Sequence, residues 1–222
     1  MPNLDDSPIR DAEIDEAPIV AVLEYSSQQA QSIADALSSS GADVYVTSNW
    51  AMCTAADGLI VPGADSDFDI QSALLAVRAA EMIDARLLAN RPVLVVGNAF
   101  NALFESRDED KFTSNSMIQW PGHSDQLAES DNAGWLRVDA AGDSKLLREL
   151  DDENFAFENT HAVFDWVLDA QGPLHAPRVS WTIKEPRFVA AVENGPLVAT
   201  QFRPELSNAA GHLLLKNWVA SL

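Results

Sequence analysis

Short apolar segments that alternate with helical ones constrain the fold of this chain most strongly. The apolar segments are Ile19–Leu23, Asp43–Thr47, Gly58–Val61 and residues 92–96, and stretches with helical periodicity lie between them. Strands that are apolar on both faces and are joined by helices are typical of a parallel sheet that helices cover on both sides. The sequence therefore predicts an α/β fold with a central, mainly parallel sheet flanked by helices.

Helices are predicted over residues 28–39, over residues 68–88 and at the end of the chain. A short helical stretch that ends near Ala51 is expected between the first two. The first should end at Gly41, since glycine readily adopts the left-handed conformation that closes a helix. The last, over residues 207–222, has Ser207 as its expected cap. Its apolar stripe consists of Leu214, Leu215, Trp218 and Leu222.

The second half of the chain has a different pattern. Its apolar segments, such as residues 134–138, 155–157, 178–182 and 188–192, are short and leave no room for helices between them. We therefore expect a mostly antiparallel extension of the sheet. The pair Asn194 and Gly195, between two strand-like segments, predicts a hairpin turn.

Composition favours one folded domain, residues 18–222, behind an acidic tail, residues 1–17, that we expect to be disordered. The chain carries 34 acidic and 14 basic residues, a formal net charge of −20. This charge opposes binding to nucleic acid or to an anionic membrane. A single cysteine, with no long apolar run and no basic leader, favours a location in the reducing cytoplasm.

The apolar segment of residues 92–96 is followed by a predicted turn at a glycine, which has no side chain. Such a buried strand running into a helix through a sharp turn is how α/β enzymes expose a nucleophile at a helix N-terminus. In this chain the turn position is Gly97. The local sequence thus predicts the architecture of a nucleophile turn without the nucleophile.

Eight motifs in order resemble one family across nearly the whole chain from Ile19 onward. On these motifs the chain resembles the HisH-type glutaminase subunits of imidazole glycerol phosphate synthase, especially the actinobacterial ones. These are class I, triad-type glutamine amidotransferases of histidine biosynthesis with a flavodoxin-like fold. The matching segments are residues 22–25, 55–63, 91–94, 103–105, 120–122, 134–135, 188–195 and 199–205.

The resemblance implies a heterodimer in which the glutaminase frees ammonia from glutamine and a (β/α)8 barrel cyclase uses it. No cofactor or metal is implied. The chemistry needs a thiolate nucleophile, a histidine base that a glutamate orients, and backbone donors for the oxyanion. At the family's cysteine this chain has Gly97, and at its histidine Arg203; only the acid, Glu205, remains.

Glycine supplies no nucleophile, and the pKa of arginine, above about 12, prevents it from acting as a base. Glutaminase activity is therefore predicted to be absent. We expect Arg203 to pair with Glu205 and fill the place of the imidazole. Asp65, within the family's oxyanion loop, would put a carboxylate where negative charge develops in catalysis.

Other positions of the family's site are remnants or substitutions. The chain has ordinary polar residues where the family has a glycine-rich loop, after Tyr25, and Leu206 where it has a lysine. Backbone N–H groups could still donate to a small anion or amide, because they do not depend on the identity of the side chains. The family's ligand pocket is therefore either retained or collapsed in this chain. The candidate ligand-binding remnants are Gly63, Ala64, Asn98, Asn101, Asn159 and Thr160.

Cys53, the sole thiol, lies before a strand and not in a sharp turn, so we interpret it as structural and not as a replacement nucleophile. Of the histidines, only His161 lies beside the family's substrate loop, and their spacing does not suggest a metal site. The four are His123, His161, His175 and His212. Trp120, Trp135 and Trp181 are expected in the core or on a subunit face.

The leading hypothesis is a catalytically degenerate homologue that acts as a binding or scaffolding subunit, with the barrel cyclase as its partner. A second hypothesis is a working amidotransferase subunit that supplies ammonia from glutamine to the cyclase. A third is a regulatory pseudoenzyme whose inert pocket senses a metabolite. The second hypothesis requires a nucleophile, and the third requires a ligand.

Overall fold

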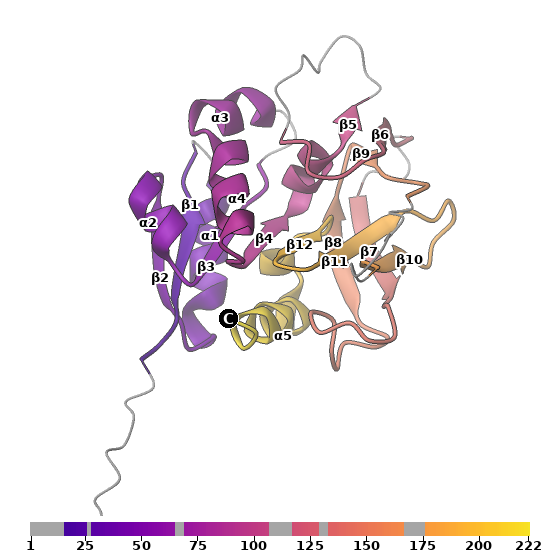
Figure 1. Ribbon diagram of the computed structural model, residues 1–222. Helices are drawn as coiled ribbons and strands as arrows, with labels where there is room; N and C mark the ends of the chain where they lie inside the picture. Colours follow the sequence, from indigo (N-terminus) through magenta and orange to yellow (C-terminus); the bar gives the residue numbers. More distant parts are fainter. Residues whose placement is uncertain (1–15, 26–27, 65–68, 107–116, 129–132, 167–175) are drawn as a thin grey trace, which may run out of the picture.

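The computed structural model describes residues 16–25, 28–64, 69–106, 117–128, 133–166 and 176–222. Its centre is a nine-stranded sheet in the order β2-β1-β3-β4-β12-β11-β10-β7-β8. The five strands at one end, β2 to β12 in this order, are parallel, and the other four are antiparallel. The predicted parallel sheet with an antiparallel extension is confirmed (Figure 1).

The strands and helices follow the chain in a regular alternation up to β4. The parallel strands are β1 (Ile19–Leu23), β2 (Asp43–Thr47), β3 (Gly58–Val61), β4 (Val93–Val96) and β12 (Leu197–Thr200). The antiparallel strands are β7 (Ala133–Asp139), β8 (Asn154–Glu158), β10 (Arg178–Thr182) and β11 (Val189–Asn194). The helices are α1 (Gln29–Ala36), α2 (Trp50–Ala55), α3 (Ile70–Ala76), α4 (Ala79–Leu88) and α5 (Asn208–Val219).

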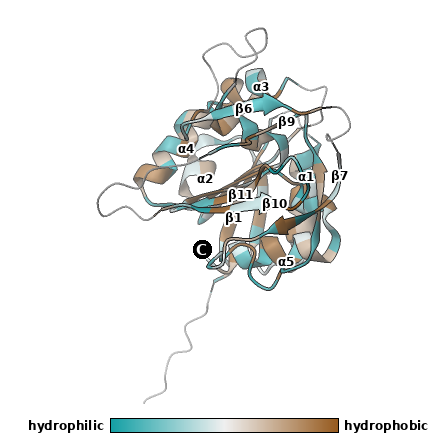
Figure 2. Ribbon diagram, turned by 90° about the vertical axis from the view of Figure 1, so that its right-hand side faces the viewer, coloured by the Kyte–Doolittle hydropathy of each residue, from teal (hydrophilic) through white to brown (hydrophobic). Residues whose placement is uncertain are grey.

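Alternate residues of the central strands enter two apolar cores, one on each face of the sheet. Val93 and Val95 of β4 pack with α2 and α4, whereas Leu94 and Val96 pack with α1 and α5. Figure 2 shows hydrophobic residues along the central strands, whereas hydrophobic and hydrophilic residues alternate along the helices. Burial on both faces explains why these strands are apolar throughout.

Arg86, on α4, joins three elements at the amino end of the parallel strands. Its guanidinium is fully buried and donates to the carbonyls of Cys53 and Ala56 and, at 2.8 Å, to Pro92. Burial lowers the pKa of Arg86 to about 10, and the charge of Arg91 contributes less to this shift. Carbonyl oxygens at the end of α2 thus solvate a buried cation in place of water.

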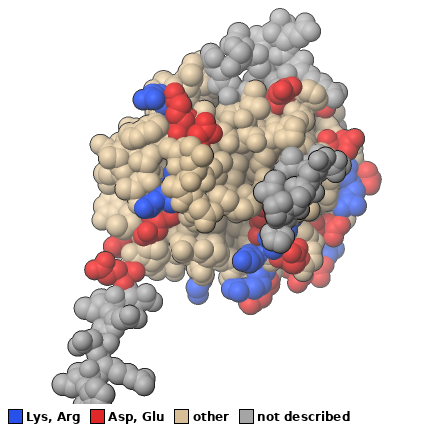
Figure 3. Space-filling view, viewed as in Figure 1, with Lys and Arg blue, Asp and Glu red and all other residues tan. Residues whose placement is uncertain are grey.

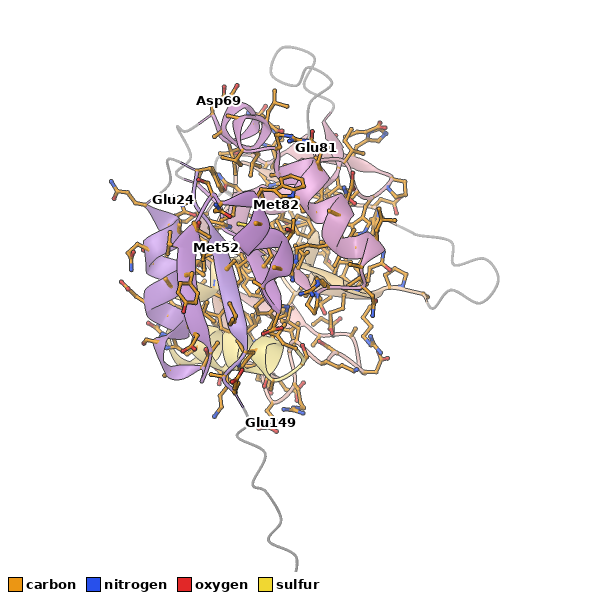
Figure 4. All side chains as sticks on the ribbon, turned by 60° about the vertical axis from the view of Figure 1, so that its left-hand side comes forward. Glu24, Met52, Asp69, Glu81, Met82 and Glu149 are labelled. Atoms are coloured by element: carbon orange, nitrogen blue, oxygen red, sulfur yellow. The ribbon has the colours of Figure 1, made fainter. Side chains whose placement is uncertain are left out.

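The helix predicted over residues 68–88 is wrong in its continuity. It is divided into α3 and α4 at Arg78, which has a left-handed backbone (φ 58°). The Arg78 guanidinium lies over the Trp50 ring, 5.0 Å from its centroid, and Nε is 3.3 Å from Glu81. In Figure 4, α4 carries the exposed Glu81 and the buried Met82. No glycine or proline in the sequence marks this break.

Three further local predictions need correction. After β4 the chain forms a 3₁₀ helix, η2 (Gly97–Leu103), and not an α-helix. The hairpin turn lies one residue later than predicted, because Asn194 is paired with Leu197 and the loop is Gly195 and Pro196. The short helical stretch expected to end near Ala51 is α2, which begins at Trp50.

Ser207 is the N-cap residue of α5, as predicted, but its side chain does not bond to the helix. Its hydroxyl donates to the Arg203 carbonyl at 2.6 Å and accepts from the Ala156 amide at 3.0 Å. The serine therefore ties β8 to the short 3₁₀ helix η4 (Pro204–Leu206). Gly211, on α5, approaches this segment so closely that a Cβ there would overlap the Pro204 carbonyl oxygen.

A small three-stranded sheet beside η2 was not predicted. It consists of β5 (Glu105–Ser106), β6 (His123–Gln126) and β9 (His161–Ala162). These strands are too short for a periodic pattern. No helix in the described part of the chain is long and apolar enough to cross a membrane.

Charged side chains lie mainly at the rim of the face shown in Figure 3, and its centre is largely uncharged. Residues 1–15 of the predicted acidic tail, residues 1–17, lie outside the described residues, so the prediction that the tail is disordered stays a prediction.

Candidate functional site

The candidate site lies where two neighbouring parallel strands end. β4 pairs with β12 so that Val96 is opposite Thr200. The residues that follow these strands therefore meet at the carboxyl edge of the sheet, where ligands bind in open α/β sheets. The Gly97 amide donates to the Phe202 carbonyl at 3.2 Å, which fixes one segment on the other.

Gly97 occupies a turn with a left-handed backbone (φ 64°). A Cβ built on it would lie 3.5 Å from the Gly63 Cα and 3.6 Å from the Arg203 Cγ, both ordinary contacts. The site thus has room for the first atom of a side chain at this position. The sharp turn that the sequence predicts at Gly97 is therefore present, and it leads into the 3₁₀ helix η2.

Arg203 forms the predicted ion pair with Glu205 and a second one that sequence reasoning missed. Its Nε donates to Glu205 Oε1 at 2.7 Å, and its Nη1 donates to Glu158 Oε2. The side chains of Arg203 and Glu205 are 13% and 1% exposed. The prediction of the pair is confirmed, and the guanidinium does not turn to bulk solvent.

The contact of Glu158 with Arg203 depends on the pairing of two distant segments. Ala156 forms an isolated antiparallel bridge with Arg203, which places the end of β8 beside the arginine. In the sequence Glu158 directly precedes the candidate residues Asn159 and Thr160. That proximity is the single signal that the sequence offered.

The charges in this cluster determine its protonation. Burial lowers the pKa of Arg203, but the carboxylates of Glu205 and Glu158 raise it more, so it lies above its ordinary value. Burial raises the pKa of Glu205 above the ordinary range, and its ion pair with Arg203 only partly offsets this. Arg203 is therefore a permanent cation and cannot accept a proton.

The loop after β3 faces Gly97, and one of its donors is already in use. The Ala64 amide donates to Asn98 Oδ1 at 2.7 Å. Tyr25 holds the loop from the other side, since its hydroxyl donates to the carbonyls of Pro62 and Gly63. Burial raises the pKa of Tyr25, so the phenol remains a donor.

A buried polar cluster adjoins the turn and contains two residues that were not predicted, Ser124 and Gln201. Asn101 Oδ1 accepts from Ser124 Oγ at 2.9 Å and from Gln201 Nε2 at 3.2 Å. Gln201 Nε2 also donates to the His161 carbonyl at 2.5 Å. The structure thereby brings Asn101 and His161 together, and Thr160 Oγ1 lies 2.9 Å from His161 Nδ1.

Several buried polar atoms of this region lack a hydrogen-bond partner among the described residues. They are both amide atoms of Asn159, Gln201 Oε1 and Glu205 Oε2. Asn159 is 1% exposed. Buried polar groups usually have a partner in the protein or an ordered water, so atoms of this kind call for an explanation.

Cys53 lies away from this site. Its carbonyl bonds to Arg86, which also bonds to Pro92 at the amino end of β4, whereas Gly97 follows the carboxyl end. The thiol is buried and 3.4 Å from the Thr47 carbonyl, and burial, only partly offset by Arg86, raises its pKa. These contacts support the interpretation of a structural cysteine.

The remaining candidates are dispersed. Trp120 is in the core, Trp181 is partly buried and Trp135 is 52% exposed. His123 Nδ1 is 3.6 Å from Glu105 Oε2. Within the described residues, no group of three or more His, Cys, Asp or Glu side chains is arranged to hold a metal. Asp65 and His175 lie outside the described residues.

Solved structures with the same arrangement of strands and helices define the class of the fold. The chain superposes with a TM-score of 0.66 on a crystal structure of a glutamine amidotransferase, over 91% of this chain and 99% of that one, at 13% identity. It superposes equally on PurLQS from Thermotoga maritima, over 92% and 98%, at 14% identity. The fold is that of the class I glutamine amidotransferases.

Sequence relatives identify the family within this class. The chain is 42% identical over 205 residues to imidazole glycerol phosphate synthase subunit HisH of Leifsonia xyli subsp. xyli, spanning 91% of this chain and 98% of the relative. The HisH of Corynebacterium diphtheriae is 41% identical, with 90% and 97% covered. The chain belongs to the HisH family. No protein-family model matches it.

The ion pairs of Arg203 generate a stability prediction. Arg203→Met leaves Glu205 buried without its cation, which should lower the free energy of unfolding at pH 8 by about 3–5 kcal/mol. Without the arginine the pKa of Glu205 rises further, so the folded variant binds a proton that the unfolded chain does not. The deficit should therefore shrink as the pH falls through the pKa of Glu205.

Urea unfolding between pH 5 and pH 8 measures this effect. The double variant Arg203→Met with Glu205→Gln, which removes both charges, is the control and should lose less stability than the single variant at pH 8. A deficit of Arg203→Met that does not change with pH would contradict the buried ion pair.

Proposed function

We propose that this member of the HisH family is a catalytically degenerate, non-catalytic subunit that does not hydrolyse glutamine. The ion pair of Arg203 carries the proposal, because it holds a permanent cation at the position where the family resemblance predicts the base that hydrolysis by a triad needs. Gly97 supports it, since the turn has no nucleophilic atom. The retained Glu205 has become the partner of the arginine.

The partner that we propose is the (β/α)8 barrel cyclase, with this chain as a binding or scaffolding subunit. The HisH relatives carry the name of a synthase subunit. Trp135 supports a protein-binding surface: it is half-exposed on β7 and lines a hollow of about 320 Å³ with Asn154 and Asn208. Tryptophan is enriched among the residues that contribute most of the binding energy of protein interfaces. A cyclase bound to an inert subunit would draw on free ammonia.

Glutamate release tests the loss of catalysis. The purified chain, mixed with the cyclase of the same organism and with glutamine, should release no glutamate above the background without protein. Gly97→Cys alone should not restore release, because Arg203 cannot take up the thiol proton. Measurable release by the unmodified chain would instead establish a working amidotransferase subunit.

A matched pair of tryptophan variants tests the proposed interface. Trp135→Ala should weaken binding to the cyclase, raising the apparent Kd at least tenfold, which corresponds to about 1.4 kcal/mol. Trp50→Ala is the control, because Trp50 is also partly exposed (39%) but lies on α2, at the β2 end of the sheet. Equal binding by both variants would place the interface elsewhere, and no binding by the unmodified chain would exclude this partner.

A metabolite-sensing role is the second candidate, and the buried polar atoms of Asn159, Gln201 and Glu205 favour it. A small ligand with amide or amine groups would supply their missing hydrogen bonds. Titration calorimetry with a panel of amino acids and amides should then detect binding that Asn159→Leu abolishes. Absence of heat across the panel, with no rise in Tm, would count against this role.

A further inference from the structure

The loop after β3 borders the position that a side chain at residue 97 would occupy. Gly63 N lies 3.8 Å and Gly63 Cα 3.5 Å from the position of a Cβ on Gly97. Asn98 N lies 3.1 Å from the position of a Cβ on Gly63, so the loop after β3 and the start of η2 face each other. In α/β hydrolytic sites, the oxyanion receives one N–H from the residue after the nucleophile and one from the loop after the third strand.

By this rule one donor is the amide of Asn98. The other comes from the oxyanion loop that the family resemblance predicts, in which we take Ala64, the residue that follows Gly63, as the donor. The Ala64 amide, however, donates to the side-chain oxygen of Asn98, at 2.7 Å. The same oxygen would lie 2.8 Å from a Cβ on Gly63, so it is pressed against the loop. A carbonyl oxygen of the protein thus takes the hydrogen bond that a substrate carbonyl oxygen would need.

We propose that Asn98 is a built-in occupant of the oxyanion position and a block to glutamine hydrolysis separate from Gly97 and Arg203. The inference rests on the proposed function, since it describes how the inert site is kept closed. It also assigns Asn98 a role that requires its side chain, where the sequence suggested only its backbone. The partly buried Asn98 and the loop stabilise each other without any ligand.

The proposal predicts that restoring the thiol and the imidazole is insufficient. An oxyanion donor is typically worth about 10²–10³ in turnover. The double variant Gly97→Cys with Arg203→His should therefore remain about 10²–10³ slower than the same variant with Asn98→Leu added. Leucine is close to asparagine in size but has no acceptor atom, so it should free the Ala64 amide.

Release of glutamate and ammonia measures this difference. In the restored site the introduced thiolate attacks the side-chain carbonyl carbon of glutamine. The C–N bond breaks, and the introduced imidazole passes its proton to the departing ammonia. Water then cleaves the thioester to glutamate and regenerates the thiol. Alkylation of the introduced thiol by iodoacetamide at similar rates in both variants is the control for access. Equal turnover in the double and triple variants, zero included, would overturn the proposal.

Amide hydrogen exchange tests the same contact without any activity. In the otherwise unmodified chain, Asn98→Leu should accelerate exchange of the Ala64 amide by at least tenfold, because its acceptor is removed. Asn98→Asp, which keeps an acceptor oxygen, should preserve the protection. Unchanged exchange in Asn98→Leu would overturn the proposal. This outcome is independent of cyclase binding and of glutamate release by the unmodified chain, which test the proposed function.

Discussion

The parallel pairing of β4 with β12 is the constraint on which the site depends. Residues from the middle and from the end of the chain meet because Val96 lies opposite Thr200, and the segments after both strands then face each other. The Gly97 amide and the Phe202 carbonyl continue this pairing beyond the sheet. Since these contacts use backbone atoms, they persist whatever side chains the site carries.

Because these backbone contacts do not use side chains, the side chains at the site can differ between relatives while the fold around the site stays the same. The frame near the site rests on close backbone approach and on burial: Gly211 packs against the Pro204 carbonyl, and Ser207 links β8 to η4. A buried arginine would be costly by itself, but Glu205 and Glu158 offset its desolvation. Asn98 adds a hydrogen bond to the loop that faces the turn. The side chains at the site thus form interactions that stabilise this region.

The sequence predicted the strands well because apolar residues on both faces leave few other structures for segments such as β3 and β4. It also predicted the Arg203 and Glu205 pair, which are separated by one residue. It failed where distant segments decide. Arg78 breaks a helix while contacting Trp50, and the hydroxyl of Ser207, the N-cap residue of α5, bonds to β8 and not to the helix. Glu158, Gln201 and Ser124 joined the site for the same reason, since no local pattern marks them.

The sequence by itself determined the class of fold, the family resemblance and the residues at the positions where that resemblance predicts the nucleophile and the base, Gly97 and Arg203. These are properties of residue type and order, which hydrophobic periodicity and motif spacing record directly. Only the tertiary structure decided that Glu158 shares the arginine and that the Asn98 side chain takes the Ala64 amide. Such contacts depend on the directions of side chains across the sheet edge, which are set when the chain packs and not by any local pattern.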